Sequence, residues 1–219
     1  MNRIALSRSK GKDNVIVPFM QLDIPPGEFA GYIFDLDGTL IDSMPVHYRA
    51  WDATLRRFGL REKLDEDVFY GLGGVPTHRV AEILGSHYGL KLDPDEVQSA
   101  KEELYGDELT NVKIIEPVAA IARRVAATHP LAIVTGGMPN VVGPALAVAK
   151  LDHLFSIVIT PHDVPAGRGK PEPDMYLLAA ERMRVPPAEC LVFEDAEPGL
   201  IGARAAGMTV VHVPSRGMG

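Results

Sequence analysis

The stretch YIFDLDGTLIDS, residues 32–43, joins an apolar run to two aspartates, Asp35 and Asp37, which are followed directly by Gly-Thr at 38–39. A short apolar run that ends in Asp-Gly is typical of a buried strand. A buried carboxylate costs free energy unless a hydrogen bond, an opposite charge or a metal ion compensates it. The two aspartates therefore indicate a chemical site at the end of this strand.

Strands and helices are expected to alternate along the second half of the chain. Segments with helical spacing separate four apolar segments: LAIVTGG at 131–137, SIVIT at 156–160, CLVFED at 190–195 and TVVHV at 209–213. This alternation predicts an α/β fold with a doubly wound parallel sheet and helices on both faces.

Residues 44–111 interrupt this pattern, because they have helical periodicity and no strand-like run. We therefore expect an α-helical cap domain over 44–111, inserted into a core domain that consists of residues 30–43 and 112–219. Residues 1–29 are expected to form an N-terminal extension, with a short strand at VIVPF, 15–19.

Composition and charge exclude several classes of protein. The net charge is −7 and the Lys and Arg residues form no long cluster, so we expect no nucleic acid partner. The apolar runs are too short to span a bilayer, and the N-terminal residues lack the pattern of a signal peptide, so we expect no membrane association. The single cysteine, Cys190, fits a reducing cytoplasm. A cytoplasmic protein is expected, with a monomer as the default.

Several polar residues follow the expected core strands at their carboxyl ends, where open parallel sheets bind ligands. They are expected to share one crevice with Lys170, which comes from the segment GRGKPEPD. The full set of expected site residues is Asp35, Asp37, Thr135, Gly136, Lys170, Glu194 and Asp195. A cluster of carboxylates without thiol or imidazole ligands suits a hard cation such as Mg²⁺. The lysine, the threonine hydroxyl and the glycine-rich turn suit a phosphoryl group. A small-molecule phosphate ester is thus the expected substrate.

The spacing of the two aspartates suits a reaction in two steps. One carboxylate could attack phosphorus in line, while the other reaches the leaving-group oxygen as a general acid and later activates water. The covalent aspartyl-phosphate would divide one difficult displacement into two easier ones.

Four segments in this order, FDLDGTLIDS, IVTGG, GKPEPD and FEDAEPGLIGARAAG, resemble the signature motifs of the haloacid dehalogenase superfamily. More closely, the chain resembles the phosphatase and β-phosphoglucomutase subfamily, which carries a helical cap after the first motif. The resemblance covers residues 30 to 213. It implies a magnesium-dependent phosphatase in which Asp35 is the nucleophile and Asp37 the general acid and base.

The same resemblance implies the other roles at the site. Thr135 and Lys170 would bind the phosphoryl group, and Lys170 would also restrain the charge of the nucleophile. Mg²⁺ would bind the Asp35 carboxylate, the main-chain carbonyl of Asp37, and Asp195. Glu194 would be a further ligand or an outer partner of the metal ion.

Two cap residues bear on the choice of substrate. The resemblance implies that His47 holds Asp37 until the cap closes. It also implies that Thr77 occupies the position where the mutase has an arginine that binds the second phosphate of a bisphosphate. Loss of that charge-assisted pair favours hydrolysis of a sugar phosphate, resembling phosphatases of fructose 1-phosphate. His78 or Arg79 could replace the arginine, so a β-phosphoglucomutase remains the alternative.

Two further alternatives come from other functional classes. A receiver-like phospho-acceptor module also uses Asp, Thr and Lys, but its acceptor lies on a middle strand and it has no cap. A non-catalytic binding protein on the same scaffold is disfavoured, because a competent residue fills every motif position.

Overall fold

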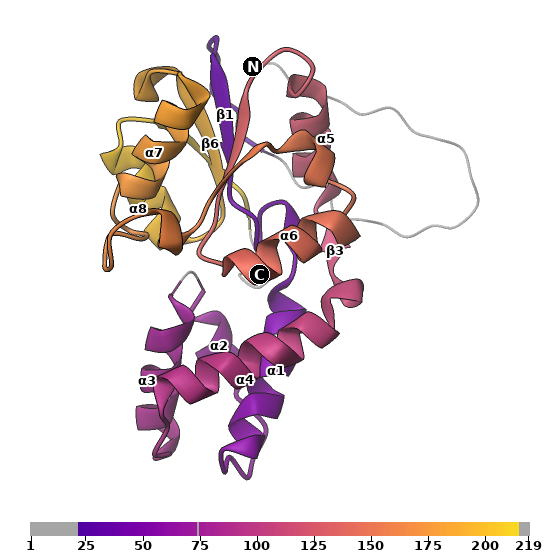
Figure 1. Ribbon diagram of the computed structural model, residues 1–219, viewed down its shortest axis with the longest axis vertical. Coiled ribbons are helices and arrows are strands. Elements are labelled where there is room, and N and C mark those ends of the chain that lie inside the picture. Colours follow the sequence, from indigo (N-terminus) through magenta and orange to yellow (C-terminus); the bar gives the residue numbers. More distant parts are fainter. Residues whose placement is uncertain (1–21, 74, 215–219) are drawn as a thin grey trace, which may run out of the picture.

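The computed structural model describes residues 22–73 and 75–214 (Figure 1). The strand expected at 15–19, and with it most of the expected N-terminal extension, lies outside the described residues. No helix within the described ranges is long and apolar enough to cross a membrane.

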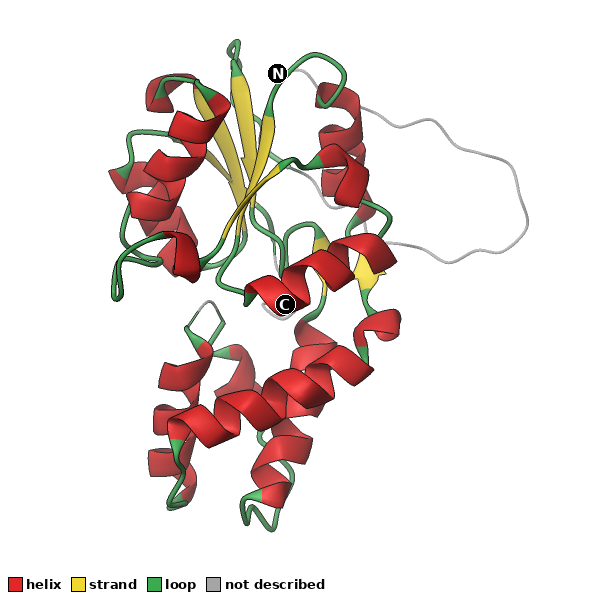
Figure 2. Cartoon of the chain, viewed as in Figure 1, coloured by secondary structure: helices red, strands yellow, loops and turns green. Residues whose placement is uncertain are grey.

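The core of the protein is a five-stranded sheet in the order β5-β4-β1-β6-β7 (Figure 2). All four strand pairings are parallel. The strands are β1 (Gly31–Phe34), β4 (Leu131–Val134), β5 (Ile157–Ile159), β6 (Cys190–Glu194) and β7 (Thr209–His212). The predicted doubly wound parallel sheet is confirmed.

Helices cover both faces of the sheet, as Figure 1 shows. Successive side chains of a strand point to opposite faces, so Phe34 of β1 packs into one apolar cluster and Ile33 into another. The Phe34 cluster includes residues of α5 (Glu116–Val125) and α6 (Pro139–Val148). The Ile33 cluster includes residues of α7 (Asp174–Met183) and α8 (Glu197–Ala205). Both faces of every central strand are thus buried, which explains the continuous apolar runs in the sequence.

Strand register aligns the ends of the three central strands. Phe34 pairs with Ile133 on one side and with Phe193 on the other. The N–H of Asp35 donates to the carbonyl of Phe193 at 2.9 Å. Residues directly after these positions therefore emerge at the same edge of the sheet.

The helical segment leaves and rejoins the core through a small antiparallel ribbon. β2 (Ile41–Asp42) precedes the helices and pairs with β3 (Lys113–Ile114), which follows them. Between the two lie α1 (Met44–Arg57), α2 (Glu66–Tyr70), α3 (Thr77–Tyr88) and α4 (Pro94–Asp107). Short 3₁₀ turns occur at Leu109–Asn111, Asp152–Leu154, Pro161–Asp163 and Pro187–Glu189.

The inserted helices have an apolar core of their own. Trp51, Leu55, Phe69, Val80 and Leu84 are buried together, separately from the two clusters of the sheet. An independent core is what a separate domain needs. This packing supports the expected cap, whose limits at 44 and 111 stay a prediction.

Capping at α4 follows the sequence pattern. The Asp93 carboxylate accepts hydrogen bonds from the N–H groups of Asp95 and Glu96 at 3.0 and 3.3 Å, and Pro94 takes the first helical position. These contacts satisfy N–H groups that have no partner within the helix. They fix the start of α4, which lines one wall of the cavity between the inserted helices and the sheet.

Candidate active site

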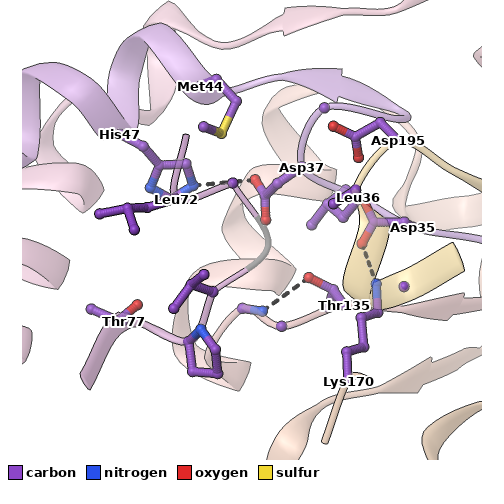
Figure 3. Close-up of a pocket in the computed structure, with 18 of the residues that line it drawn as sticks. Asp35, Leu36, Asp37, Met44, His47, Leu72, Thr77, Thr135, Lys170 and Asp195 are labelled. Atoms are coloured by element: carbon purple, nitrogen blue, oxygen red, sulfur yellow. Dashed lines mark hydrogen bonds and ion pairs between the residues drawn. The ribbon is translucent and has the colours of Figure 1, made fainter. Parts of the chain in front are cut away.

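A cavity of about 1530 Å³ lies between the carboxyl edge of the sheet and the inserted helices. Side chains from both parts line it, as Figure 3 shows. All the residues predicted for the site line this cavity: Asp35, Asp37, His47, Thr77, Thr135, Gly136, Lys170, Glu194 and Asp195. The structure thus brings the predicted set together around one cavity, while the roles of these residues stay predictions.

Lys170 joins two of the buried acids. Its Nζ lies 2.7 Å from Asp35 Oδ1 and 2.7 Å from Glu194 Oε2. The lysine comes from the loop before α7, whereas the acids come from the ends of β1 and β6. One cation shared between two carboxylates offsets part of their mutual repulsion.

Three carboxylates at this edge could hold a metal ion. One oxygen each from Asp35, Glu194 and Asp195 lies within 4.8 Å of the others. Asp35 Oδ2 is buried and has no hydrogen-bond partner. The three carboxylates and Lys170 together carry a formal net charge of −2, which a divalent cation would neutralise. An unpartnered buried oxygen and an oxygen-only donor set both fit a hard divalent cation.

Two glycines make room for the acids. A Cβ on Gly38 would lie 2.2 Å from Asp195 Oδ2, and a Cβ on Gly199 would lie 2.1 Å from the carboxylate of Glu194. Gly38 also has φ +88°, a conformation that disfavours any residue with a side chain. Glycine is therefore required at both positions for the acids to lie where they do.

The pKa values of the site residues reflect the short distances between their charged groups. Burial, followed by the charge of Glu194, raises the pKa of Asp35 well above its usual range and raises that of Asp195 to about 7. Burial lowers the pKa of Lys170, but the charges of Asp35 and Glu194 outweigh it and the pKa is raised well above its usual range. Lys170 is therefore a permanent cation, and a bound divalent cation would favour the ionised form of Asp35 and Asp195.

Asp37 faces the inserted helices rather than the other acids (Figure 3). Its Oδ1 accepts a hydrogen bond from Ser43 Oγ at 2.5 Å and lies 3.4 Å from His47 Nε2. Burial raises the pKa of Asp37, but these contacts outweigh it and the pKa is lowered. His47 thus lies next to Asp37, and the expected role of holding Asp37 until the cap closes stays a prediction.

The position of His47 is fixed by a neighbouring ring. The imidazole stacks on Tyr105 with centroids 4.0 Å apart and planes 5° from parallel. Burial, followed by the charge of Lys101, lowers the pKa of His47. A neutral imidazole carries no charge, so in the tautomer with its proton on Nε2 the contact with Asp37 is a hydrogen bond and not an ion pair.

Thr135 is fully buried at the end of β4 and lines the cavity. Its Oγ1 accepts a hydrogen bond from the N–H of Gly137 at 3.0 Å. Accepting this bond leaves the hydroxyl proton free to be donated, and Gly136 beside it carries no side chain. The hydroxyl is therefore placed to donate into the cavity, and phosphoryl binding by Thr135 and Gly136 stays a prediction.

The sequence did not single out Lys101 of α4. Its side chain is 3% exposed, lines the cavity, and forms an ion pair with Glu102 at 3.0 Å. The Nζ lies 4.9 Å from the centre of the Tyr105 ring. A lysine on an amphipathic helix is usually on the solvated face. Lys101 is recognised as part of the site only in the folded protein, where α4 packs against α1 and lines the cavity.

The four motifs, the cavity and the acidic cluster agree with what is found in known proteins. The family model of haloacid dehalogenase-like hydrolases matches residues 29–207. The chain belongs to this family.

Curated relatives of this haloacid dehalogenase-like hydrolase include sugar-phosphate phosphatases. Fructose-1-phosphate phosphatase YqaB of Escherichia coli is 36% identical over 185 residues, which cover 84% of this chain and 96% of the relative. Hexitol phosphatase A of the same organism is 33% identical, over 84% of this chain and 82% of the relative.

Solved structures of the family share its architecture. A haloacid dehalogenase family hydrolase from Deinococcus radiodurans with bound phosphate and sodium superposes with a TM-score of 0.62 at 31% identity, covering 83% of this chain and 79% of that one. CbbY from Rhodobacter sphaeroides in complex with phosphate gives 0.74 at 23% identity, with 87% and 90% covered, and shows the likeness of the fold.

These comparisons confirm the predicted family and enzyme class. The haloacid dehalogenase-like chain is a phosphoric monoester hydrolase, and the mutase alternative is less supported. The relatives act on small phosphate esters, and the buried acidic cluster of this chain could hold a metal ion.

Proposed function

We propose that this phosphatase hydrolyses a small sugar phosphate, of the type of fructose 1-phosphate, in a magnesium-dependent reaction through a phosphorylated Asp35. The observation that carries the proposal is the state of the Asp35 carboxylate. Lys170 holds one of its oxygens, and the other is buried without a partner beside Asp195.

Magnesium is proposed as the metal ion because every available donor is an oxygen. The carboxylates of Asp35 and Asp195 would hold it together with the main-chain carbonyl of Asp37, and Glu194 would lie around it. When bound, the ion supplies positive charge that orients the phosphoryl group and offsets the charge that develops on it. The carbonyl of Asp37 and the identity of the metal remain predictions.

The first chemical step is assigned to Asp35. One of its carboxylate oxygens attacks phosphorus while the bond from phosphorus to the sugar oxygen breaks. Lys170 and Thr135 would bind the phosphoryl oxygens, since both line the cavity beside Asp35. Asp37 would give its proton to the departing sugar oxygen.

The second step regenerates the enzyme. Asp37, now ionised, would take a proton from a water molecule that attacks the phosphorus of phosphorylated Asp35, which releases inorganic phosphate and the free carboxylate. In the structure Ser43 and His47 hold Asp37 in its ionised form. We propose that closure of the cap separates Asp37 from these contacts, so that its pKa rises and it takes up a proton from water, which it then gives to the sugar oxygen.

The cap side of the cavity supports a substrate whose second end is uncharged. Among the described side chains that line it, Lys101 is the only cap lysine, no cap arginine occurs, and Glu102 already pairs with Lys101. A neighbouring hydroxyl could still bind to this pair, whereas a second phosphate would need a cation without a partner. The printed activities of the relatives, on fructose 1-phosphate and hexitol phosphate, agree with such a substrate.

Neither candidate for the missing arginine reaches the cavity. His78 and Arg79 are about half exposed or more, do not line it, and lie close to Glu82. Thr77, at the start of α3, does line it, and it carries no charge. This arrangement disfavours retention of a bisphosphate intermediate and hence the mutase.

A panel of phosphorylated metabolites assayed for phosphate release, with and without Mg²⁺, tests the proposal. We expect hexose and hexitol monophosphates to be hydrolysed faster than phosphoglycolate or nucleoside monophosphates. In a separate assay, β-glucose 1-phosphate with catalytic glucose 1,6-bisphosphate should release inorganic phosphate. Accumulation of glucose 6-phosphate without free phosphate would contradict the proposal and favour the mutase. The cytoplasmic location and the monomeric state stay predictions.

A further inference from the structure

Tyr176 of α7 contacts the acidic cluster from the apolar interior of the core and not from the cavity. Its side chain is fully buried among apolar residues such as Met175 and Ala179, and it does not line the cavity. A phenylalanine would fill the same apolar space, so packing alone does not require a hydroxyl here. The hydroxyl nevertheless has a partner, since it donates to Glu194 Oε2 at 2.8 Å.

A continuous series of polar contacts connects this hydroxyl to the nucleophile. Glu194 Oε2 also accepts from Lys170 Nζ at 2.7 Å, and the same Nζ donates to Asp35 Oδ1 at 2.7 Å. The other oxygen of Glu194, Oε1, accepts from the N–H of Ala196 at 3.2 Å. Both oxygens of Glu194 therefore have hydrogen-bond partners, in contrast to Asp35, whose Oδ2 has none.

We infer that Tyr176 is a positioning residue for the proposed phosphatase reaction: its hydroxyl holds the Glu194 carboxylate beside Lys170, which keeps Lys170 on Asp35 and keeps Glu194 from binding the metal ion directly. The inference rests on the proposed function for its consequence in catalysis. The contact itself is independent of that function.

Loss of the hydroxyl has two expected consequences. Glu194 Oε2 would keep one donor in place of two, so the carboxylate would no longer be held beside Lys170, and the lysine would lose the contact that keeps its ammonium on Asp35. The less restrained carboxylate could also turn toward the cation position, because its oxygen already lies within 4.8 Å of those of Asp35 and Asp195. Turnover should then fall while the metal ion binds more tightly.

The test compares Tyr176→Phe with Tyr48→Phe. Tyr48 is a matched control, because it is also buried and its hydroxyl also makes one hydrogen bond, to the carbonyl of Leu64 at 2.6 Å. For Tyr176→Phe we expect kcat on p-nitrophenyl phosphate to fall about tenfold with KM changed by less than about twofold. Calorimetry without substrate should show Mg²⁺ binding about threefold tighter. Tyr48→Phe should leave all three quantities unchanged.

Glu194→Gln provides a further check on the metal ion. An amide lacks the charge that attracts the cation, so adding Tyr176→Phe to Glu194→Gln should not tighten Mg²⁺ binding further. If the tighter binding persists in this background, Glu194 is not the group that Tyr176 controls, and the inference is wrong.

The remaining outcomes are equally decisive. A Tyr176→Phe enzyme with kcat within about twofold of the wild type, or with Mg²⁺ affinity unchanged or weakened, overturns the inference. If the wild type releases phosphate from no ester, the proposed function fails. The calorimetric comparison needs no turnover, and it still decides whether Tyr176 restrains Glu194.

Discussion

Lys170 Nζ lies 2.7 Å from Asp35 Oδ1, and the other oxygen of the same carboxylate is buried with no hydrogen-bond partner. The lysine thus fixes the orientation of the carboxylate and leaves its second oxygen to the divalent cation. A nucleophile held in a fixed direction is what in-line attack on phosphorus requires.

Asp35→Asn should abolish phosphatase activity and leave the fold intact. An amide cannot form the acyl phosphate, so kcat should fall by about a thousandfold or more. Phosphate release from p-nitrophenyl phosphate measures the loss, and circular dichroism checks the fold. Asp107→Asn, at an exposed position in α4, serves as the control and should keep full activity. Near-normal rates for Asp35→Asn would mean that another group is the nucleophile.

Removal of divalent cations should stop turnover, and Mg²⁺ should restore it. Because Asp195 is one of three converging carboxylates, Asp195→Asn should raise the Mg²⁺ concentration needed for half-maximal activity by about tenfold or more. The measurement is a Mg²⁺ titration after chelation. Activity of the wild type that persists in excess chelator would contradict the proposed metal dependence.

Lys101→Met should affect the sugar end of the substrate more than the phosphate end. Methionine keeps the length of the side chain and removes the ammonium donor, so KM for the preferred sugar phosphate should rise about tenfold. Hydrolysis of p-nitrophenyl phosphate, which has no sugar hydroxyls, should change by less than about threefold. Lys91→Met, at an exposed position, is the control. Equal effects on both substrates would place Lys101 at the phosphoryl group.

Asp52 should make the stability of the protein depend on pH in the acid range. Its carboxylate accepts from Arg56 Nε at 2.9 Å and from the N–H of Leu64 at 2.8 Å. Burial raises the pKa of Asp52, but these bonds outweigh it and the pKa lies below its ordinary 3.8. The contribution to stability is therefore present above pH 3.8, and it is lost as the pH falls through the lowered value.

The corresponding experiment compares the wild type with Asp52→Asn. At pH 7 the variant should be less stable by about 1 kcal/mol, since one backbone bond and one partly exposed ion pair are weakened. Denaturant unfolding at several pH values should show that the difference shrinks below pH 3.8. Activity at pH 7 should be unchanged, because Asp52 does not line the cavity. A difference that grows in acid would contradict the assignment.

Much of the core and its site could be predicted because neighbouring residues encode them. The apolar run before Asp35 fixes a strand, and the strand register then determines that Asp35 and Glu194 emerge at one edge. Parallel strands deliver their carboxyl ends to the same side, so the polar residues that follow them converge without any long-range information.

Other features depend on contacts between distant segments and left no local signal. Lys101 is buried because α4 packs against α1 and borders the cavity, and nothing in its own helix distinguishes it from a solvated lysine. Tyr176 looks like a core aromatic, and its hydroxyl acquires a role only from Glu194, eighteen positions further along. The β2–β3 ribbon has two residues in each strand, which is too short for any periodic pattern.

That ribbon has a consequence for how such an enzyme changes its preferred metabolite. Ile41 pairs with Ile114, so the backbone departs from the sheet domain and returns to it at adjacent points. The helices between β2 and β3 can therefore be exchanged as one unit, because a different set of helices needs only the same two anchor strands. Recombination in nature or in the laboratory could then alter selectivity for the sugar while Asp35 and its partners stay untouched.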